Sequence, residues 1–375
     1  MKYTFISFLM ILIINATSAQ STAKEWYDKG KTLGNSSKFS EAIIAYEKAI
    51  GLDKGYHEAY YSLGFVYNEK KEYAKAIENL EKVIELKPQH ARAFNELSYA
   101  NRKLGKYTEA LEYVNKAIAI RPDNAAAYKE LGDVYIELYR DEDAFTAYKK
   151  AYSLDNKNSA ACYELGYWNN SKGNYKEALI WLNRGALVEQ STNIYNEIGL
   201  AHSYLKENDA AIAAYTKSIQ IDPYNSTAFR SIGDIYRLNY KPAKIDDAID
   251  YYNRAISANS KNAEAYYGIG WCNNELYKYD DAITNLKKAT EINSSLSNAY
   301  TELGYAQYMK GYNTDALANL DKAIAKNSKD DNAVYYKGLV YCYMKDKPNA
   351  LKALELLKTL NTKSADKLTT KINSL

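Results

Sequence analysis

The sequence predicts an all-α solenoid, built from ten two-helix repeats over residues 23–364 and closed by a capping helix over 365–375. The first observation is a small residue, glycine in nine of ten cases, that recurs at intervals of 33 to 37 residues and most often 34. The second is an alanine that follows it after twelve residues in nine repeats and after fifteen in the other. A fixed period of this length indicates units that each pack on the next. The small residues are Gly30, Gly64, Ser98, Gly132, Gly166, Gly199, Gly233, Gly270, Gly304 and Gly338, and the alanines are Ala42, Ala76, Ala110, Ala144, Ala178, Ala211, Ala248, Ala282, Ala316 and Ala350.

Each repeat is expected to form two antiparallel helices, A and then B, because apolar residues recur at helical spacing around both marker positions. Glycine and alanine carry no bulk, so the glycine of helix A is expected to face the alanine of helix B and let the backbones approach closely. Clusters of small polar residues, such as those at 155–158, predict breaks between repeats. Paired acids at the starts of B helices, such as Asp246 and Asp247, are expected to favour the helix dipole.

This pattern resembles the tetratricopeptide-repeat family, in which an aromatic residue stands four positions before the glycine. Cys162 and Val334 depart from that pattern, and the proline that often closes a repeat is present only as Pro88, Pro122 and Pro223. The resemblance covers about residues 23–364 and implies a right-handed superhelix whose A helices line a concave groove for peptides or proteins. The aromatic residues are Trp26, Tyr60, Phe94, Tyr128, Tyr195, Phe229, Tyr266 and Tyr300.

Two irregularities interrupt the period. One residue is missing around 189–191, and three are added around 240–243. Variation in loop length is the favoured interpretation, since loops tolerate such changes. A local bend of the superhelix that shapes the groove is the alternative.

The first residues are typical of a secretory signal. Lys2 precedes an apolar core from Phe5 to Ile14, and small residues at 17–19 predict cleavage before Gln20. The signal is therefore expected over 1–19, with an uncleaved anchor as the alternative, and no membrane span is expected afterwards. The protein is expected to be exported, and to be periplasmic, secreted or held at the cell surface.

The bulk composition argues against several functions. Lys and Arg number 49 and Asp and Glu 46, and they alternate along the helices, so no nucleic-acid partner is expected. Cys162, Cys272 and Cys342 stand 110 and 70 residues apart, match no metal motif and are interpreted as packing residues. No serine-hydrolase, phosphate-loop or zinc-protease motif occurs in the sequence. A non-enzyme is predicted, with no catalytic residue, no metal and no cofactor.

Positions are counted along each repeat so that the marker glycine, such as Gly132, is position eight. The resemblance implies groove contacts at positions two, five, nine, twelve and thirteen, all on helix A. Position nine is aromatic in five repeats, where relatives more often have a polar residue, and packing between neighbouring A helices is the alternative role for these rings. The carboxylate clamp of some relatives is absent, because Lys129 at position five is followed by Asp133 at position nine. The predicted partner-binding residues are Phe65, Tyr99, Tyr167, Arg230, Arg237, Tyr267, Trp271, Tyr305, Tyr308 and Tyr335.

Three functions are compatible with this sequence. The favoured one is a non-catalytic scaffold that binds a protein or peptide in the groove, with the C-terminal aromatic residues as anchors and an envelope complex as one setting. The second is a glycan-binding module in which tyrosine and tryptophan rings stack on sugars. The third is a passive structural subunit of an envelope or secretion assembly, held along its convex face.

Overall fold

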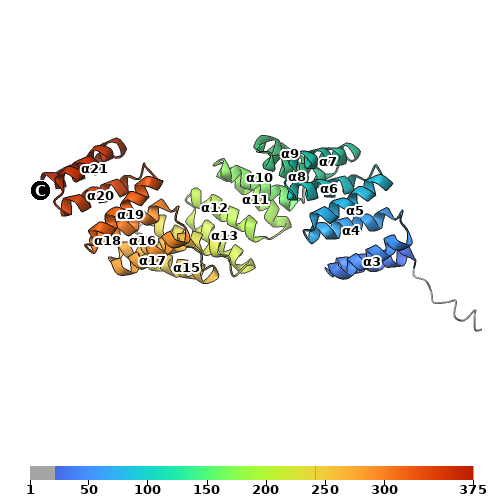
Figure 1. Ribbon diagram of the computed structural model, residues 1–375, viewed down its shortest axis with the longest axis horizontal. Helices are drawn as coiled ribbons and strands as arrows, with labels where there is room; N and C mark the ends of the chain where they lie inside the picture. The colour runs from blue at the N-terminus through green and yellow to red at the C-terminus, as the bar shows by residue number, and fades with distance from the viewer. Residues whose placement is uncertain (1–21, 241, 375) are drawn as a thin grey trace, which may run out of the picture. The chain divides into compact units, whose positions relative to one another are not determined.

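The computed structural model describes residues 22–240 and 242–374, and within them it is all-helical (Figure 1). Ten helix pairs are followed by one further helix, as the sequence predicts. The A helices have 13 residues each: α2 (Ala23–Asn35), α4 (His57–Glu69), α6 (Ala91–Lys103), α8 (Ala125–Glu137), α10 (Ser159–Ser171), α12 (Thr192–Tyr204), α14 (Ser226–Leu238), α16 (Ala263–Glu275), α18 (Ser297–Met309) and α20 (Asp331–Tyr343).

The B helices have 14 residues each and complete the pairs. They are α3 (Phe39–Leu52), α5 (Tyr73–Leu86), α7 (Tyr107–Ile120), α9 (Asp141–Leu154), α11 (Tyr175–Val188), α13 (Asn208–Ile221), α15 (Ile245–Ala258), α17 (Tyr279–Ile292), α19 (Asn313–Lys326) and α21 (Lys347–Leu360), and the last helix is α22 (Thr362–Asn373). The chain divides into two compact units, Met1–Trp168 and Asn169–Leu375, which we call unit 1 and unit 2.

The glycine of helix A packs differently from the expectation. A Cβ added at Gly30 would lie 2.6 Å from the ring of Tyr46, and one at Gly64 would lie 2.6 Å from Leu80 Cγ. The neighbour is therefore mainly the large helix-B residue at position twenty-four of the repeat, and the predicted pairing of glycine with alanine was wrong in this respect. At Gly64 the carbonyl oxygen of Ala76 is also within 3.2 Å of that Cβ, so the close backbone approach is present there. The glycine makes room for a side chain from the facing helix.

A left-handed residue ends almost every A helix. It stands at position fifteen, as in Lys71 with φ 61° and Gly105 with φ 76°. In the second repeat the Lys71 N–H donates to Asn68 O and the Glu72 N–H to Tyr67 O, which is the Schellman arrangement that satisfies the last carbonyls of a helix. This turn reverses the chain so that helix B packs back on helix A.

Loops absorb both irregularities of the period. The linker between α11 and α12 is 189–191, and the turn between α14 and α15 is lengthened to 239–244, yet all four helices keep the standard lengths. In the longer turn the Tyr240 hydroxyl donates to Asp209 Oδ1 at 2.9 Å, which ties the turn to the preceding helix B. The loops therefore vary in length at both places, and the alternative of a local bend that shapes the groove stays a prediction.

The last helix covers the end of the solenoid. It begins at Thr362, three residues earlier than the sequence suggests. Leu368 and Ile372 are buried, and Leu368 occupies the space beside Gly338 that a helix-B side chain fills in other repeats. Lysines occupy the exposed side of this helix, as a cap requires.

Two further features bear on the sequence predictions. Cys162, Cys272 and Cys342 are buried thiols, and burial raises the pKa of Cys272 to about 12, so these residues pack as small apolar groups. No helix within 22–240 and 242–374 is long and apolar enough to cross a membrane. The predicted signal, 1–19, lies outside the described residues.

Candidate functional site

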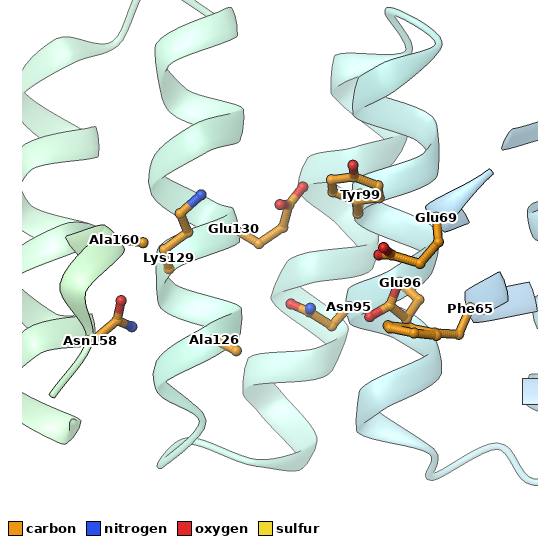
Figure 2. A pocket seen from close by; sticks show the side chains of 10 residues that line it. All are labelled: Phe65, Glu69, Asn95, Glu96, Tyr99, Ala126, Lys129, Glu130, Asn158 and Ala160. Atoms are coloured by element: carbon orange, nitrogen blue, oxygen red, sulfur yellow. The ribbon is translucent and has the colours of Figure 1, made fainter. Parts of the chain in front are cut away.

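The A helices of unit 1 bring their groove positions together around a pocket of about 360 Å³. Figure 2 shows Phe65, Glu69 and Tyr99 at one end and Lys129 at the other. The Phe65 ring is 41% exposed, which is unusual for a phenylalanine and leaves it available to a partner. The lining residues come from four successive A helices and the turn before the last: Phe65, Glu69, Asn95, Glu96, Tyr99, Ala126, Lys129, Glu130, Asn158 and Ala160.

A second pocket of about 360 Å³ adjoins the first and shares Asn95, Glu96 and Ala126 with it. Its remaining walls are formed by α4, by the start of α6 and by the turn before α8. These walls add positive charge, whereas the first pocket carries both signs. We call the two pockets together the N-terminal groove; the additional residues are Tyr61, Arg92, Arg121 and Asn124.

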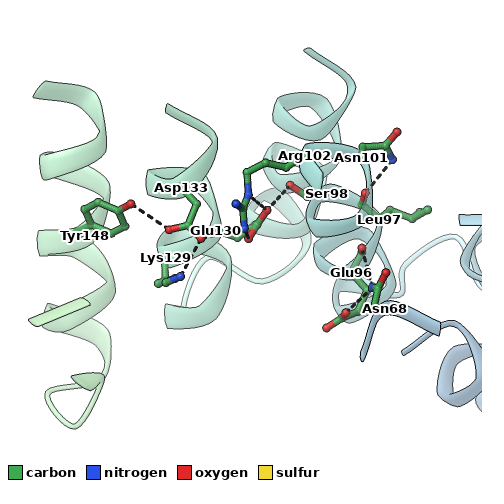
Figure 3. A network of polar contacts seen from close by, with 10 residues as sticks. All are labelled: Asn68, Glu96, Leu97, Ser98, Asn101, Arg102, Lys129, Glu130, Asp133 and Tyr148. Carbon is green, nitrogen blue, oxygen red and sulfur yellow. Dashed lines mark hydrogen bonds and ion pairs between the residues drawn. The ribbon is translucent and has the colours of Figure 1, made fainter. Parts of the chain in front are cut away.

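A buried ion pair holds the floor of the N-terminal groove. Arg102 donates from Nε to Glu130 Oε1 at 2.8 Å and from Nη2 to Glu130 Oε2 at 2.9 Å, and also reaches Asp133 Oδ2 at 3.0 Å (Figure 3). Asp133 further accepts from Lys129 at 2.8 Å and from the Tyr148 hydroxyl at 3.0 Å. The network joins α6, α8 and α9, and its bidentate geometry fixes neighbouring A helices against each other.

An uncharged version of the same bridge recurs between other repeats. Asn68 Nδ2 donates to the Glu96 carbonyl at 3.3 Å and to its Oε2 at 2.9 Å. The pairs Asn170–Glu197 and Asn274–Glu302 repeat this pattern, with 2.8 Å to the carboxylate in each. An amide offers no compensating charge, so burial raises the pKa of Glu96 and Glu197, and raises that of Glu302 to about 7.

These glutamates stand at position six of their repeats, which is not one of the predicted groove positions. Aligning the ten repeats would have shown the signal, because glutamate occupies that position five times. The five residues are Glu96, Glu130, Glu164, Glu197 and Glu302. Glu96, Glu130, Glu197 and Glu302 link neighbouring repeats, and Glu96 and Glu130 also line the N-terminal groove.

In unit 2 a comparable network surrounds Asp234. Its Oδ1 accepts from the Tyr252 hydroxyl at 2.7 Å and from Arg237 Nη2 at 3.3 Å, and its Oδ2 accepts from Arg230 at 2.6 Å. Arg230 is half-buried and lines a pocket of about 260 Å³ between α12 and α14. A partner could therefore reach Arg230, one of the predicted contact residues.

Arg237 lies differently from what direct partner contact requires. It is 9% exposed, donates from Nε to Tyr252 at 2.9 Å, and stacks its guanidinium 5.4 Å from the Tyr267 centroid and 5.1 Å from that of Trp271. Its charge is compensated within the fold by Asp234. The residue positions Tyr267 and Trp271, and any effect it has on a partner passes through those two rings.

The C-terminal aromatic residues pack largely on one another. Tyr305 lies 4.8 Å from Tyr336 between ring centroids, Tyr335 lies 5.9 Å from Tyr336, and Tyr308 lies 6.1 Å from Tyr343. Tyr305, Tyr308 and Tyr335 are half-buried, as are Tyr267 and Trp271. These rings therefore form a wall that is partly core and partly accessible, which combines the two roles considered for them.

Tyr167 is the most exposed of the predicted aromatic contacts. It belongs to unit 1, is 51% exposed, and lies 6.2 Å from Tyr163 in a stacked arrangement. Neither residue lines the N-terminal groove. Within unit 1 the structure thus brings Phe65 and Tyr99 to one site and leaves Tyr167 outside it, and within unit 2 it brings Tyr267 and Trp271 together.

Comparison with known proteins identifies the repeat. Family models described as "Tetratricopeptide repeat" match residues 23–56, 55–123, 102–161 and 192–225, and one described as "TPR repeat" matches 275–311. Together they span more than half of the chain. The protein belongs to the tetratricopeptide-repeat family. Tetratricopeptide-repeat proteins are in general non-catalytic scaffolds for protein interactions, and no group of three or more metal-ligating side chains occurs in the described part of this one.

Individual relatives are distant. Protein bimA of Emericella nidulans is 28% identical over 81 residues, which cover 22% of this chain and about a tenth of that protein's length. The crystal structure of the C-terminal part of a TPR repeat-containing protein from Cytophaga hutchinsonii has a TM-score of 0.52 at 18% identity, covering 65% of this chain and 99% of that one. The APC/C hetero-tetramer Cut9–Hcn1 gives 0.54 at 15% identity, covering 90% and 80%. Both structures support the tetratricopeptide-repeat fold.

Proposed function

We propose that this tetratricopeptide-repeat protein is an exported, non-catalytic scaffold that binds an extended segment of a protein partner along its A helices. The observation that carries the proposal is the N-terminal groove, which consists of two adjoining pockets of about 360 Å³ each. The first pocket presents Phe65 and Tyr99 beside charged side chains, and the second presents Arg92 and Arg121. Aromatic side chains dominate the binding energy of interfaces when a pocket presents them. Export rests on the signal-like segment 1–19, and places the partner in the periplasm, at the cell surface or in an envelope complex.

The predicted C-terminal contacts form a second part of the proposed surface. Trp271 and Tyr267 are held in place by Arg237, and Tyr305 and Tyr308 continue the aromatic wall. A preorganised ring loses little conformational entropy when it contacts a partner.

Selection from a displayed library of random twelve-residue peptides tests this proposal. The purified wild-type protein is compared with Phe65→Ala/Tyr99→Ala, with Trp271→Ala/Tyr305→Ala, and with Ile44→Ala as a control for an exposed apolar residue on a B helix. Peptides that bind wild type and the control, and lose about 2 kcal/mol or more with either pair, support the scaffold. Retention by all variants would move the interface to the B helices, as a passive structural subunit requires, and no enrichment at all would refute peptide binding.

Glycan binding is the second candidate. It is favoured by stacked tyrosine pairs with an exposed member, such as Tyr175 and Tyr204, whose ring centroids lie 4.6 Å apart with planes 3° apart and of which Tyr204 is 59% exposed. Binding of soluble polysaccharides, abolished by Tyr204→Ala and unaffected by the Phe65 and Tyr99 changes, would support this function over the scaffold.

A further inference from the structure

The chemistry of the N-terminal groove indicates which kind of peptide it takes, an inference that rests on the proposed scaffold function. The argument depends on which of its charges are already neutralised by neighbours in the fold. Glu130 is neutralised by Arg102, Glu96 accepts a hydrogen bond from Asn68, and Lys129 is paired with Asp133. Burying a partner against these groups gains no new ion pair.

Two arginines of the second pocket remain available. Arg92 forms no ion pair with any described residue, and Arg121 has only Asp123, at 3.7 Å, on its own turn. Both side chains are exposed and line the same pocket. Guanidinium groups bind carboxylates through paired, charge-assisted hydrogen bonds. This end of the groove is therefore complementary to a carboxylate.

The first pocket favours a different kind of ligand side chain. Phe65 and Tyr99 present aromatic surface there, which favours an aromatic or large aliphatic side chain. Glu69 lies beside them and has no ion pair among the described residues, so a second acidic group is disfavoured at this end. The two pockets thus have different preferences, and a ligand that spans both has a defined direction.

Asn95 stands where the pockets meet. It lines both of them, and its Oδ1 has no hydrogen-bond partner although it is shielded from solvent. An unpaired amide oxygen at this point can accept from the backbone N–H of a chain that passes between the pockets. A peptide backbone supplies such donors at every residue other than proline.

The spacing follows from helix geometry. Arg92 and Tyr99 are seven residues apart on α6, which corresponds to about 10 Å along the helix axis. An extended peptide advances about 3.3 Å per residue, so about three residues cover that distance. We propose that the N-terminal groove binds an extended peptide segment in which a carboxylate, held by Arg92 and Arg121, lies two to four residues from an aromatic or large aliphatic side chain held by Phe65 and Tyr99.

The test uses the same displayed library and then labelled synthetic peptides of one enriched sequence. We expect enriched peptides to carry Asp or Glu two to four residues from Phe, Tyr, Trp or Leu. Changing that acid to Lys should weaken binding by about tenfold or more in fluorescence polarisation. The variant Arg92→Glu/Arg121→Glu should lose the acidic peptide and gain the Lys peptide, whereas Arg140→Glu, an exposed arginine outside both pockets, should change neither.

The outcomes separate this inference from the proposed function. Enriched peptides that depend on Phe65 and Tyr99 but show no acidic preference would overturn the inference and leave the scaffold standing. No enrichment would overturn both. Peptides with a free and an amidated C-terminus distinguish the two sources of a carboxylate: loss on amidation assigns it to the chain terminus, and no loss assigns it to a side chain. The Lys peptide requires no change in the protein, so a poorly folded variant cannot hide the answer.

Discussion

Glu302 makes the stability of this protein depend on pH in a way that one substitution can remove. Glu302 is half-buried on α18, where its carboxylate accepts from Asn274 Nδ2 of α16 at 2.8 Å. Burial is the main cause that raises its pKa from 4.5 to about 7, while Glu275 and Asp330 add repulsion and Asn274 and Arg237 act in the opposite direction. A group whose pKa is higher in the folded state binds its proton more tightly there.

The magnitude follows from that shift. Stability from the bound proton is fully present below pH 4.5 and is lost as the pH rises through 7. Each pKa unit corresponds to about 1.4 kcal/mol, so the buried charge costs about 3 kcal/mol at pH 8 and less than about 1 kcal/mol at pH 5. Glu302→Gln keeps the size and the acceptor of the side chain but cannot ionise. The variant should therefore exceed the wild type in unfolding free energy by about 3 kcal/mol at pH 8, and by much less at pH 5.

Urea unfolding followed by circular dichroism at the two pH values measures this difference. Both proteins contain the other glutamates, so the contributions of those residues to the pH dependence of stability cancel in the difference. Glu264→Gln, at an exposed position on α16, is the matched control and should show no dependence on pH. An advantage of Glu302→Gln that is equal at pH 5 and pH 8 would refute the assignment of a buried, protonated carboxyl group.

Three other predictions concern stability and use the same unfolding assay. Gly268→Ala places a methyl group into the ring of Tyr252 and should cost about 1–3 kcal/mol, whereas Gly51→Ala, with open space around it, should be neutral or stabilising by up to about 1 kcal/mol. Lys71→Gly relieves a left-handed residue and should stabilise by about 1 kcal/mol; destabilisation would contradict this role. Arg102→Met leaves Glu130 buried and unpaired and should cost about 3–5 kcal/mol at pH 7, most of which the added change Glu130→Gln should restore.

The start of each repeat could be predicted because it is marked by small residues that are all required for close packing. All ten marker alanines are fully buried in the core, and the helices end where the polar clusters are. The pairing of glycine with alanine could not be derived in the same way. Sequence spacing shows which positions are small but does not show which neighbouring side chain fills the space, and in Gly30 that neighbour is the Tyr46 ring.

The candidate site was predictable only in part, because a sequence shows which residues carry charge but not which charges are paired. Phe65 and Tyr99 were found because an aromatic residue at position nine is unusual. Arg237 was assigned to partner contact because it stands at groove position twelve, but its ion pair with Asp234 and its hydrogen bond to Tyr252 are visible only in the fold. The ligand preference of a groove depends on the charges that remain unpaired, and only the side-chain geometry shows which charges these are.

One regularity links the groove to the core and can itself be tested. Each of the five repeats with an aromatic residue at position nine has an aliphatic residue at position twenty-four, and each of the four with tyrosine at position twenty-four has a non-aromatic residue at position nine. The first set is Phe65/Leu80, Tyr99/Val114, Tyr167/Leu182, Trp271/Leu286 and Tyr305/Leu320, and the second is Lys31/Tyr46, Asp133/Tyr148, Leu200/Tyr215 and Asp234/Tyr252. The structure explains the exclusion, because the tyrosine of helix B passes beside the glycine and its hydroxyl reaches position nine, as Tyr148 and Tyr252 show.

A double-mutant cycle in the sixth repeat measures this coupling. Tyr215 is buried, so Tyr215→Leu should cost about 2–4 kcal/mol through the space it leaves. Leu200→Tyr alone adds a ring where one is already present, and should cost about 1–3 kcal/mol by overpacking. In the double variant the new ring can occupy the vacated space, so the combined cost should fall below the sum by at least about 1 kcal/mol. Additive costs would mean that the two positions do not share one space, and the mutual exclusion of aromatic residues at positions nine and twenty-four would then need another cause.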